Sequence, residues 1–94
     1  MNDITKIKAD FAALEIAYTA QHIYTFTDYA DCIGIVLALP SADRCDRTLC
    51  ASYKALTNLF SIAVDTIAGT TPADYTATFL SYGEMVDEVN RLME

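Results

Sequence analysis

The sequence predicts an all-α fold, a small antiparallel up-and-down helical bundle with three long helices and one short apolar helix. The main observation is a pattern of apolar residues in Asp43–Gly69, which recur at alternating spacings of four and three and therefore share one helical face. A similar spacing recurs near both ends of the chain, and the short connections between the patterned segments favour antiparallel neighbours. The 94 residues, 1–94, are expected to form a single domain.

The first predicted helix covers Asp3–Thr25, and a second, shorter helix covers Asp28–Leu39. Asp3 is a candidate N-cap, because a short acidic side chain accepts hydrogen bonds from the free N–H groups at the start of a helix. The segment 32–39 is ambiguous, because its β-branched residues and Gly34 suit a buried strand as well as a helix. We assign it to a helix, because no other segment is predicted as a strand that could pair with it.

The two remaining helices are predicted from apolar faces and from one capping signal. The face of the long helix consists of Leu49, Tyr53, Leu56, Phe60, Ala63 and Ile67. The last helix begins with Thr71 as N-cap and Pro72 in the first helical position, where the missing N–H of proline is not needed. Its apolar face consists of Tyr75, Phe79, Tyr82, Val86, Val89 and Met93.

The composition predicts a soluble, cytoplasmic protein that contacts neither a membrane nor nucleic acid directly. The longest apolar run, 32–39, has eight residues, against about 20 for a helix that spans a bilayer. Asp3 and Asp10 interrupt the N-terminal region, which differs from the basic and then apolar start of a signal peptide. Thirteen acidic and six basic residues give a net charge of −7, whereas phosphate binding needs clustered Lys and Arg.

The sequence contains no catalytic, cofactor-binding or metal-binding motif, so we expect a protein that is not an enzyme and uses no cofactor. His22 is the only histidine, and no acidic residue lies three or four positions from it. The three cysteines, Cys32, Cys45 and Cys50, are odd in number and form no CxxC pair, which argues against a disulfide framework and a zinc site. We expect reduced, mostly buried thiols.

The acidic end of the last predicted helix is the main candidate for a binding surface. Its carboxylates, with Arg91 as the nearby counter-charge, are Glu84, Asp87, Glu88 and Glu94. Such a cluster suits a Lys- and Arg-rich surface of another protein, although a solvated helix end that serves only solubility is the alternative. We expect the patch to be extended by two acidic residues and two exposed tyrosines, Asp28, Asp31, Tyr24 and Tyr29.

These features predict a non-catalytic protein that docks on a basic surface of a partner protein and blocks it. In size and acidity the chain is similar to bacterial immunity proteins and to phage-encoded inhibitors, including anti-CRISPR proteins. The alternative is a structural or scaffolding protein that self-associates, for example as a homodimer, because the apolar helix faces exceed what one bundle core needs. A small enzyme or ligand binder is the third hypothesis, and it lacks a constellation of polar residues.

Overall fold

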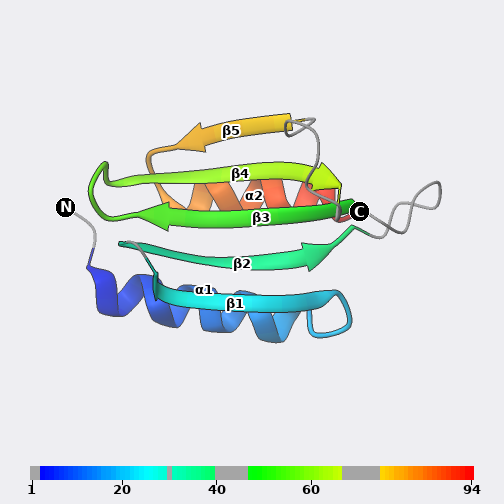
Figure 1. The fold of residues 1–94 in the computed structure, drawn as a ribbon, viewed down its shortest axis with the longest axis horizontal. Coiled ribbons are helices and arrows are strands. Elements are labelled where there is room, and N and C mark those ends of the chain that lie inside the picture. The colour runs from blue at the N-terminus through cyan, green and yellow to red at the C-terminus, as the bar shows by residue number, and fades with distance from the viewer. Residues whose placement is uncertain (1–2, 30, 40–46, 67–74) are drawn as a thin grey trace.

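A five-stranded antiparallel sheet with two helices on one of its faces forms the fold in the computed structural model (Figure 1). The structure describes residues 3–29, 31–39, 47–66 and 75–94. The elements are, in chain order, α1 (Ile4–Ala17), β1 (His22–Tyr29), β2 (Cys32–Ala38), β3 (Arg47–Lys54), β4 (Leu59–Thr66), β5 (Tyr75–Phe79) and α2 (Tyr82–Leu92). The predicted all-α bundle is therefore wrong, and the fold is mixed α/β.

The strands cross the sheet in the order in which they occur in the chain, β1-β2-β3-β4-β5. Every neighbouring pair is antiparallel, so the sheet is a meander. The pairing of β1 with β2 has two register irregularities, whereas the other three pairs keep a continuous register. Alternate residues of β2 to β5 therefore point to the same side, one set toward the helices and the other away from them.

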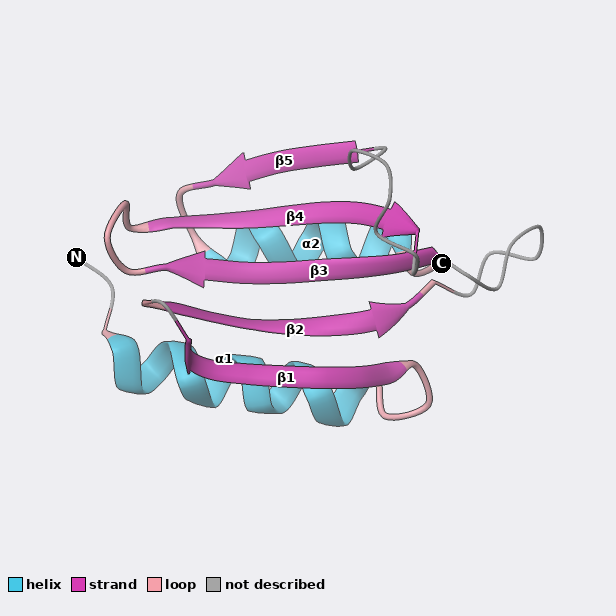
Figure 2. Cartoon of the chain, viewed as in Figure 1, coloured by secondary structure: helices cyan, strands magenta, loops and turns pink. Residues whose placement is uncertain are grey.

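Both helices cover the same face of the sheet, and they lie behind the strands in Figure 2. α1 packs against β1 and β2, and α2 packs against β4 and β5. The core between these layers consists of Ile7, Phe11, Leu14, Ile33, Ile35, Leu37, Leu49, Ala51, Tyr53, Phe60, Ile62, Val64, Met85, Val89 and Met93. Neither helix in the described part of the chain is long and apolar enough to cross a membrane. We call the opposite side of the sheet the open face, because none of the described helices covers it.

The segment predicted as the long helix, Asp43–Gly69, instead contains the hairpin β3–β4. Leu49 and Tyr53 are four residues apart, a spacing that places two side chains on the same side of a strand as well as of a helix. The chain reverses between the strands, where Asn58 adopts a φ of 55°, a left-handed conformation that asparagine tolerates. The helix prediction fails at this turn, since it places Leu56 on the apolar face, whereas Leu56 is 79% exposed.

The segment predicted as the second helix, Asp28–Leu39, contains the central strand β2. β2 pairs with β1 on one side and β3 on the other, so its backbone groups have the partners that the sequence analysis did not find. Ile33, Ile35 and Leu37 alternate toward the helices and are buried. The helix prediction is wrong because the segments that pair with β2 on both sides are themselves strands, β1 and β3.

The two terminal helices were predicted in part. α1 is shorter than the predicted Asp3–Thr25, but its N-cap is confirmed, since Oδ1 of Asp3 accepts a hydrogen bond of 2.9 Å from the N–H of Thr5. The last predicted helix is divided into β5 and α2, and the N-cap of α2 is Ser81. The predicted cap at 71–72 lies outside the described residues.

Gly34 in β2 is a position where a larger side chain should destabilise the fold, because the ring of Phe26 from β1 lies over it. A Cβ added at Gly34 would lie 2.4 Å from Cζ of Phe26 and 2.7 Å from the backbone oxygen of Ala51. The backbone of a central strand cannot move aside as a flexible side chain can. We therefore expect Gly34→Ala to lower the free energy of unfolding by about 1–3 kcal/mol, measured by urea denaturation.

The control is the same substitution at Gly83 in α2, where an added Cβ meets nothing within 4 Å. Alanine is favoured over glycine in a helix by up to about 1 kcal/mol, so Gly83→Ala should be neutral or stabilising. A Gly34→Ala protein as stable as the wild type would show that the ring of Phe26 does not hold this position over β2.

Candidate interaction surface

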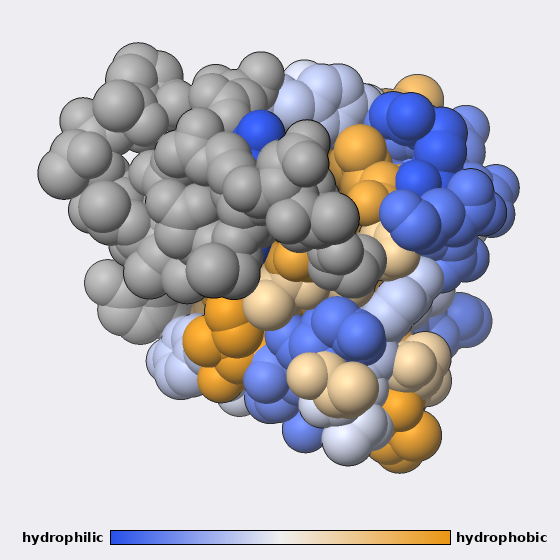
Figure 3. Space-filling view, turned by 90° about the vertical axis from the view of Figure 1, so that its right-hand side faces the viewer, coloured by the Kyte–Doolittle hydropathy of each residue, from blue (hydrophilic) through white to orange (hydrophobic). Residues whose placement is uncertain are grey.

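α2 turns one side to the sheet and the opposite side to solvent. Met85 and Val89 are buried in the core. Glu84 and Asp87 are exposed, and their helical spacing places them on the side of α2 that faces away from these two residues. Glu94 is exposed as well, but it lies just beyond the C-cap of α2, outside the helix. We call these three residues the acidic stripe. In Figure 3, which views the end of the molecule near the C-terminus, hydrophilic residues gather in a broad area beside smaller apolar patches.

The three carboxylates of the acidic stripe are open to an external partner. No hydrogen bond or ion pair holds them to another side chain among the residues that the structure describes. Glu84 follows the N-cap Ser81 in the first turn of α2, where the helix dipole stabilises negative charge. Arg91 is the one basic residue of α2, and it binds Glu88. The stripe therefore presents uncompensated negative charge to solvent.

Glu88 differs from the acidic stripe, because its carboxylate is used within the fold. Oη of Tyr75 in β5 donates to Oε2 of Glu88 at 2.5 Å, and Arg91 donates through Nε at 2.6 Å and Nη2 at 2.5 Å. These hydrogen bonds, first from Arg91 and then from Tyr75, lower the pKa of Glu88 to about 2. The Glu88 side chain is only 16% exposed. Of the four predicted carboxylates, this one ties α2 to the edge strand β5.

The other predicted binding residues lie on β1 and in the turn after it. Tyr24 is 58% exposed and points to the open face, opposite the helices. Asp31 is exposed in the turn between β1 and β2 and has a φ of 62°. Asp28 and Tyr29 belong to β1, but their side chains lie outside what the structure describes. β1 is the strand at one edge of the sheet, whereas α2 packs on β4 and β5 toward the other edge (Figure 1). The predicted residues therefore do not form one patch.

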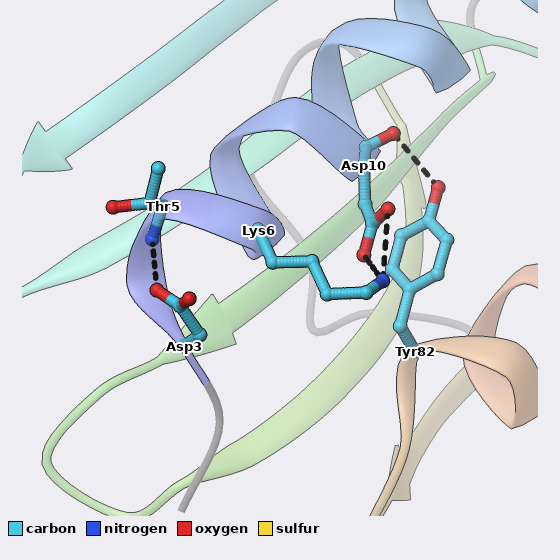
Figure 4. A network of polar contacts seen from close by, with 5 residues as sticks. All are labelled: Asp3, Thr5, Lys6, Asp10 and Tyr82. Atoms are coloured by element: carbon cyan, nitrogen blue, oxygen red, sulfur yellow. Dashed lines mark hydrogen bonds and ion pairs between the residues drawn. The ribbon is translucent and has the colours of Figure 1, made fainter.

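Tyr82 holds α2 against α1 and so fixes the direction in which the acidic stripe points. Its Oη donates to the backbone oxygen of Asp10 at 2.9 Å, and its ring packs edge-on against Phe11 and Phe60 with centroid distances of 5.8 and 6.1 Å. Figure 4 shows this contact beside the ion pair of Lys6 with Asp10. Burial, and then the charge of Asp10, raise the pKa of Tyr82 to about 12, so the hydroxyl remains a donor at neutral pH.

His22 and the described cysteines are placed on different sides of the sheet. Nε2 of His22 lies 2.6 Å from Oγ1 of Thr25, which in turn donates to Oε2 of Glu15 in α1 at 3.0 Å. This chain joins β1 to α1 on the helix-covered side. Cys32 and Cys50 are free thiols that alternate onto the open face. Within the described ranges, no group of three or more His, Cys, Asp and Glu residues is arranged to hold a metal ion.

The low pKa of Glu88 predicts a pH-dependent contribution to stability. The folded value of about 2 lies below the ordinary value of 4.5, so ionised Glu88 stabilises the fold above about pH 4.5, and this contribution is lost as the pH falls toward 2. We expect Glu88→Gln to lower the melting temperature at about pH 7 and to have no effect at about pH 2. Thermal unfolding followed by circular dichroism measures both values.

Glu84→Gln is the matched control, because Glu84 lies on the same helix without a side-chain partner among the described residues. Its effect on the melting temperature should be small at both pH values. A Glu88→Gln effect of equal size at neutral and acidic pH would contradict the charged hydrogen bonds described for Glu88.

Comparisons with known proteins provide no counterpart for this surface. No family model, curated protein or solved structure matches the chain. The function of this surface is therefore inferred from the geometry and charge of the described residues.

Proposed function

We propose that this protein is a non-catalytic binding protein that docks through α2 on a basic surface of a partner protein and blocks that surface. The observation that supports the proposal is the acidic stripe, in which Glu84 and Asp87 on the outer side of α2 and Glu94 just beyond its end are exposed without an ion-pair partner among the described residues. The apolar side of α2 is buried in the core, so the stripe is the side that the helix offers to other molecules.

The stripe suits a partner that carries several Lys or Arg side chains in a row. From Glu84 to Leu92, where α2 ends, the chain advances eight residues, which is about 12 Å along the helix, and Glu94 follows two residues later. Each exposed charge pair contributes only about 0.2–1 kcal/mol, so a docking site of this kind needs several of them. The net charge of −7 adds long-range attraction that accelerates the encounter with a basic protein and repels nucleic acid.

The internal contacts of α2 support binding by reducing its entropic cost. Tyr82 ties the helix to α1, and the Tyr75–Glu88–Arg91 cluster ties it to β5. A surface that is already held in its bound arrangement loses less conformational freedom on association.

We place the protein in the cytoplasm, where free thiols such as Cys32 and Cys50 stay reduced.

The partner is first recovered from nuclease-treated lysate of source cells, identified by mass and purified. The test then compares how tightly the wild-type chain and the double variant Glu84→Gln/Asp87→Asn bind this partner. Removal of two charge pairs should weaken the affinity about two- to thirty-fold. The affinity of the wild type should also fall more steeply than that of the variant when salt rises from about 50 to about 300 mM. Isothermal titration calorimetry at several salt concentrations measures both effects.

The matched control is Ala9→Lys/Ala13→Lys, two exposed positions of α1. It changes the net charge by the same amount, from −7 to −5, without touching α2. We expect this control to keep most of the affinity. Equal losses in the two variants would show that net charge and not the acidic stripe governs binding, and no loss in either would remove α2 from the interface.

A further inference from the structure

The open face of the sheet carries regular rows of side chains that run across the strands. Because the register from β2 to β5 is continuous, residues that pair across neighbouring strands lie side by side. One row consists of Tyr24, Val36, Cys50, Ala63 and Thr76. The next row consists of Phe26, Gly34, Ser52, Ser61 and Thr78.

In these two rows the side chains differ in size, with large aromatic rings on β1 at one edge of the sheet and small side chains on β4 and β5 at the other. The rings of Tyr24 and Phe26 stack with a centroid distance of 6.1 Å, and Phe26 covers Gly34, which has no side chain of its own. We call these two rings the aromatic ridge. On the other half of the face, β4 and β5 contribute only small or short side chains in the same rows, namely Ser61, Ala63, Thr76 and Thr78. We call these four the small-residue floor.

The open face also differs from the helix side in charge. Lys54 is the charged residue among the described strand side chains of this face, and the register places one carboxylate-bearing residue, Asp65, opposite Thr48 at the end of β4. The chain as a whole has a net charge of −7, and the acidic stripe lies on the helix side. Two copies of this acidic protein would repel each other through their helices, whereas the rows at the middle of the open face are uncharged, with Lys54 and Asp65 only at opposite ends of the strands.

From this shape and charge we infer that two copies of the chain stack their open faces to form a homodimer. A two-fold axis parallel to the strands places β1 of one copy over β5 of the other. In this arrangement the aromatic ridge of each copy rests on the small-residue floor of its partner. One surface supplies both halves of the contact, which is the requirement for a two-fold interface. The strands of the two sheets would run within about 30° of each other, about 10 Å apart.

The available area is consistent with a weak but specific dimer. Five strands spaced about 4.8 Å apart, with paired stretches of about 20 Å, give a face of about 500 Å² per copy. Two such faces bury about 1,000 Å² in total, which is at the lower limit for specific protein interfaces. We therefore expect a dissociation constant in the micromolar range, so that dimer and monomer are both populated at accessible concentrations.

Sedimentation velocity of the full chain between about 5 and about 500 µM tests the dimer. The interface variant is Ser61→Glu/Thr78→Glu, which places two carboxylates on the small-residue floor of each copy. The matched control is Ala9→Glu/Ala13→Glu, which adds the same charge on exposed positions of α1. We expect the wild type and the control to dimerise and the interface variant to dissociate at least about 100-fold more readily, because its carboxylates would be buried without partners.

Circular dichroism and melting temperature show whether each variant keeps its fold. If the interface variant does not fold, Tyr24→Ser takes its place, since this ring is 58% exposed and its removal leaves the core intact. Loss of half of the ridge should weaken the dimer about ten-fold. A wild-type protein that stays monomeric overturns the proposal. A dimer that is equally stable in a folded interface variant also overturns it, because the two copies would then meet elsewhere, such as along the edge of β5.

Discussion

The burial of a single sheet face governs the rest of the structure. Ile35, Leu37 and Leu49 of the central strands have no exposed surface beneath the two helices. Burial of apolar area of this kind is the main driving force for folding, at about 25 cal/mol per Å². Because strand side chains alternate, covering one face assigns every second residue to the open face. Because α2 is amphipathic, the same contact directs its carboxylates to water, so the acidic stripe and the open face are two consequences of one layer of packing.

Hydrogen-bonded tyrosines fix the helices within this layer. Tyr82 and Tyr75 each place an aromatic ring at the border of the core and a hydroxyl at its rim, where the backbone oxygen of Asp10 and the carboxylate of Glu88 accept the hydrogen bonds. Apolar contact alone is non-directional and permits a helix to slide or rotate over a sheet. Hydrogen bonds with defined partners select one position, and this is the property that a row of exposed carboxylates needs in order to match a row of cations on another protein.

Leu49 and Tyr53 show why apolar spacing alone did not reveal the fold class. Residues four apart share a side in both a helix and a strand, so the pattern fits either, and Asn58 at the turn was the local signal that separated the two strands. The helix prediction is correct only for Ile4–Ala17 and Tyr82–Leu92, because the rest of the two predicted terminal helices contains β1 and β5. The carboxylates of α2 could be found from sequence because they are neighbours in the chain. The bond of Glu88 to Tyr75 could not, because it joins a helix to a strand whose existence depends on the sheet.

The two proposed contacts use opposite sides of the molecule and are therefore compatible. Stacking of open faces puts a helix layer on each outer side of a four-layered dimer, with both acidic stripes facing solvent. Layers spaced about 10 Å apart place the two stripes about 40 Å from each other. A small basic partner cannot span that distance, so each dimer would bind two partner molecules or one partner that is itself two-fold symmetric. In the symmetric case the second contact becomes intramolecular, and a weak docking site of a few charge pairs would reach an avidity well above its single-site affinity.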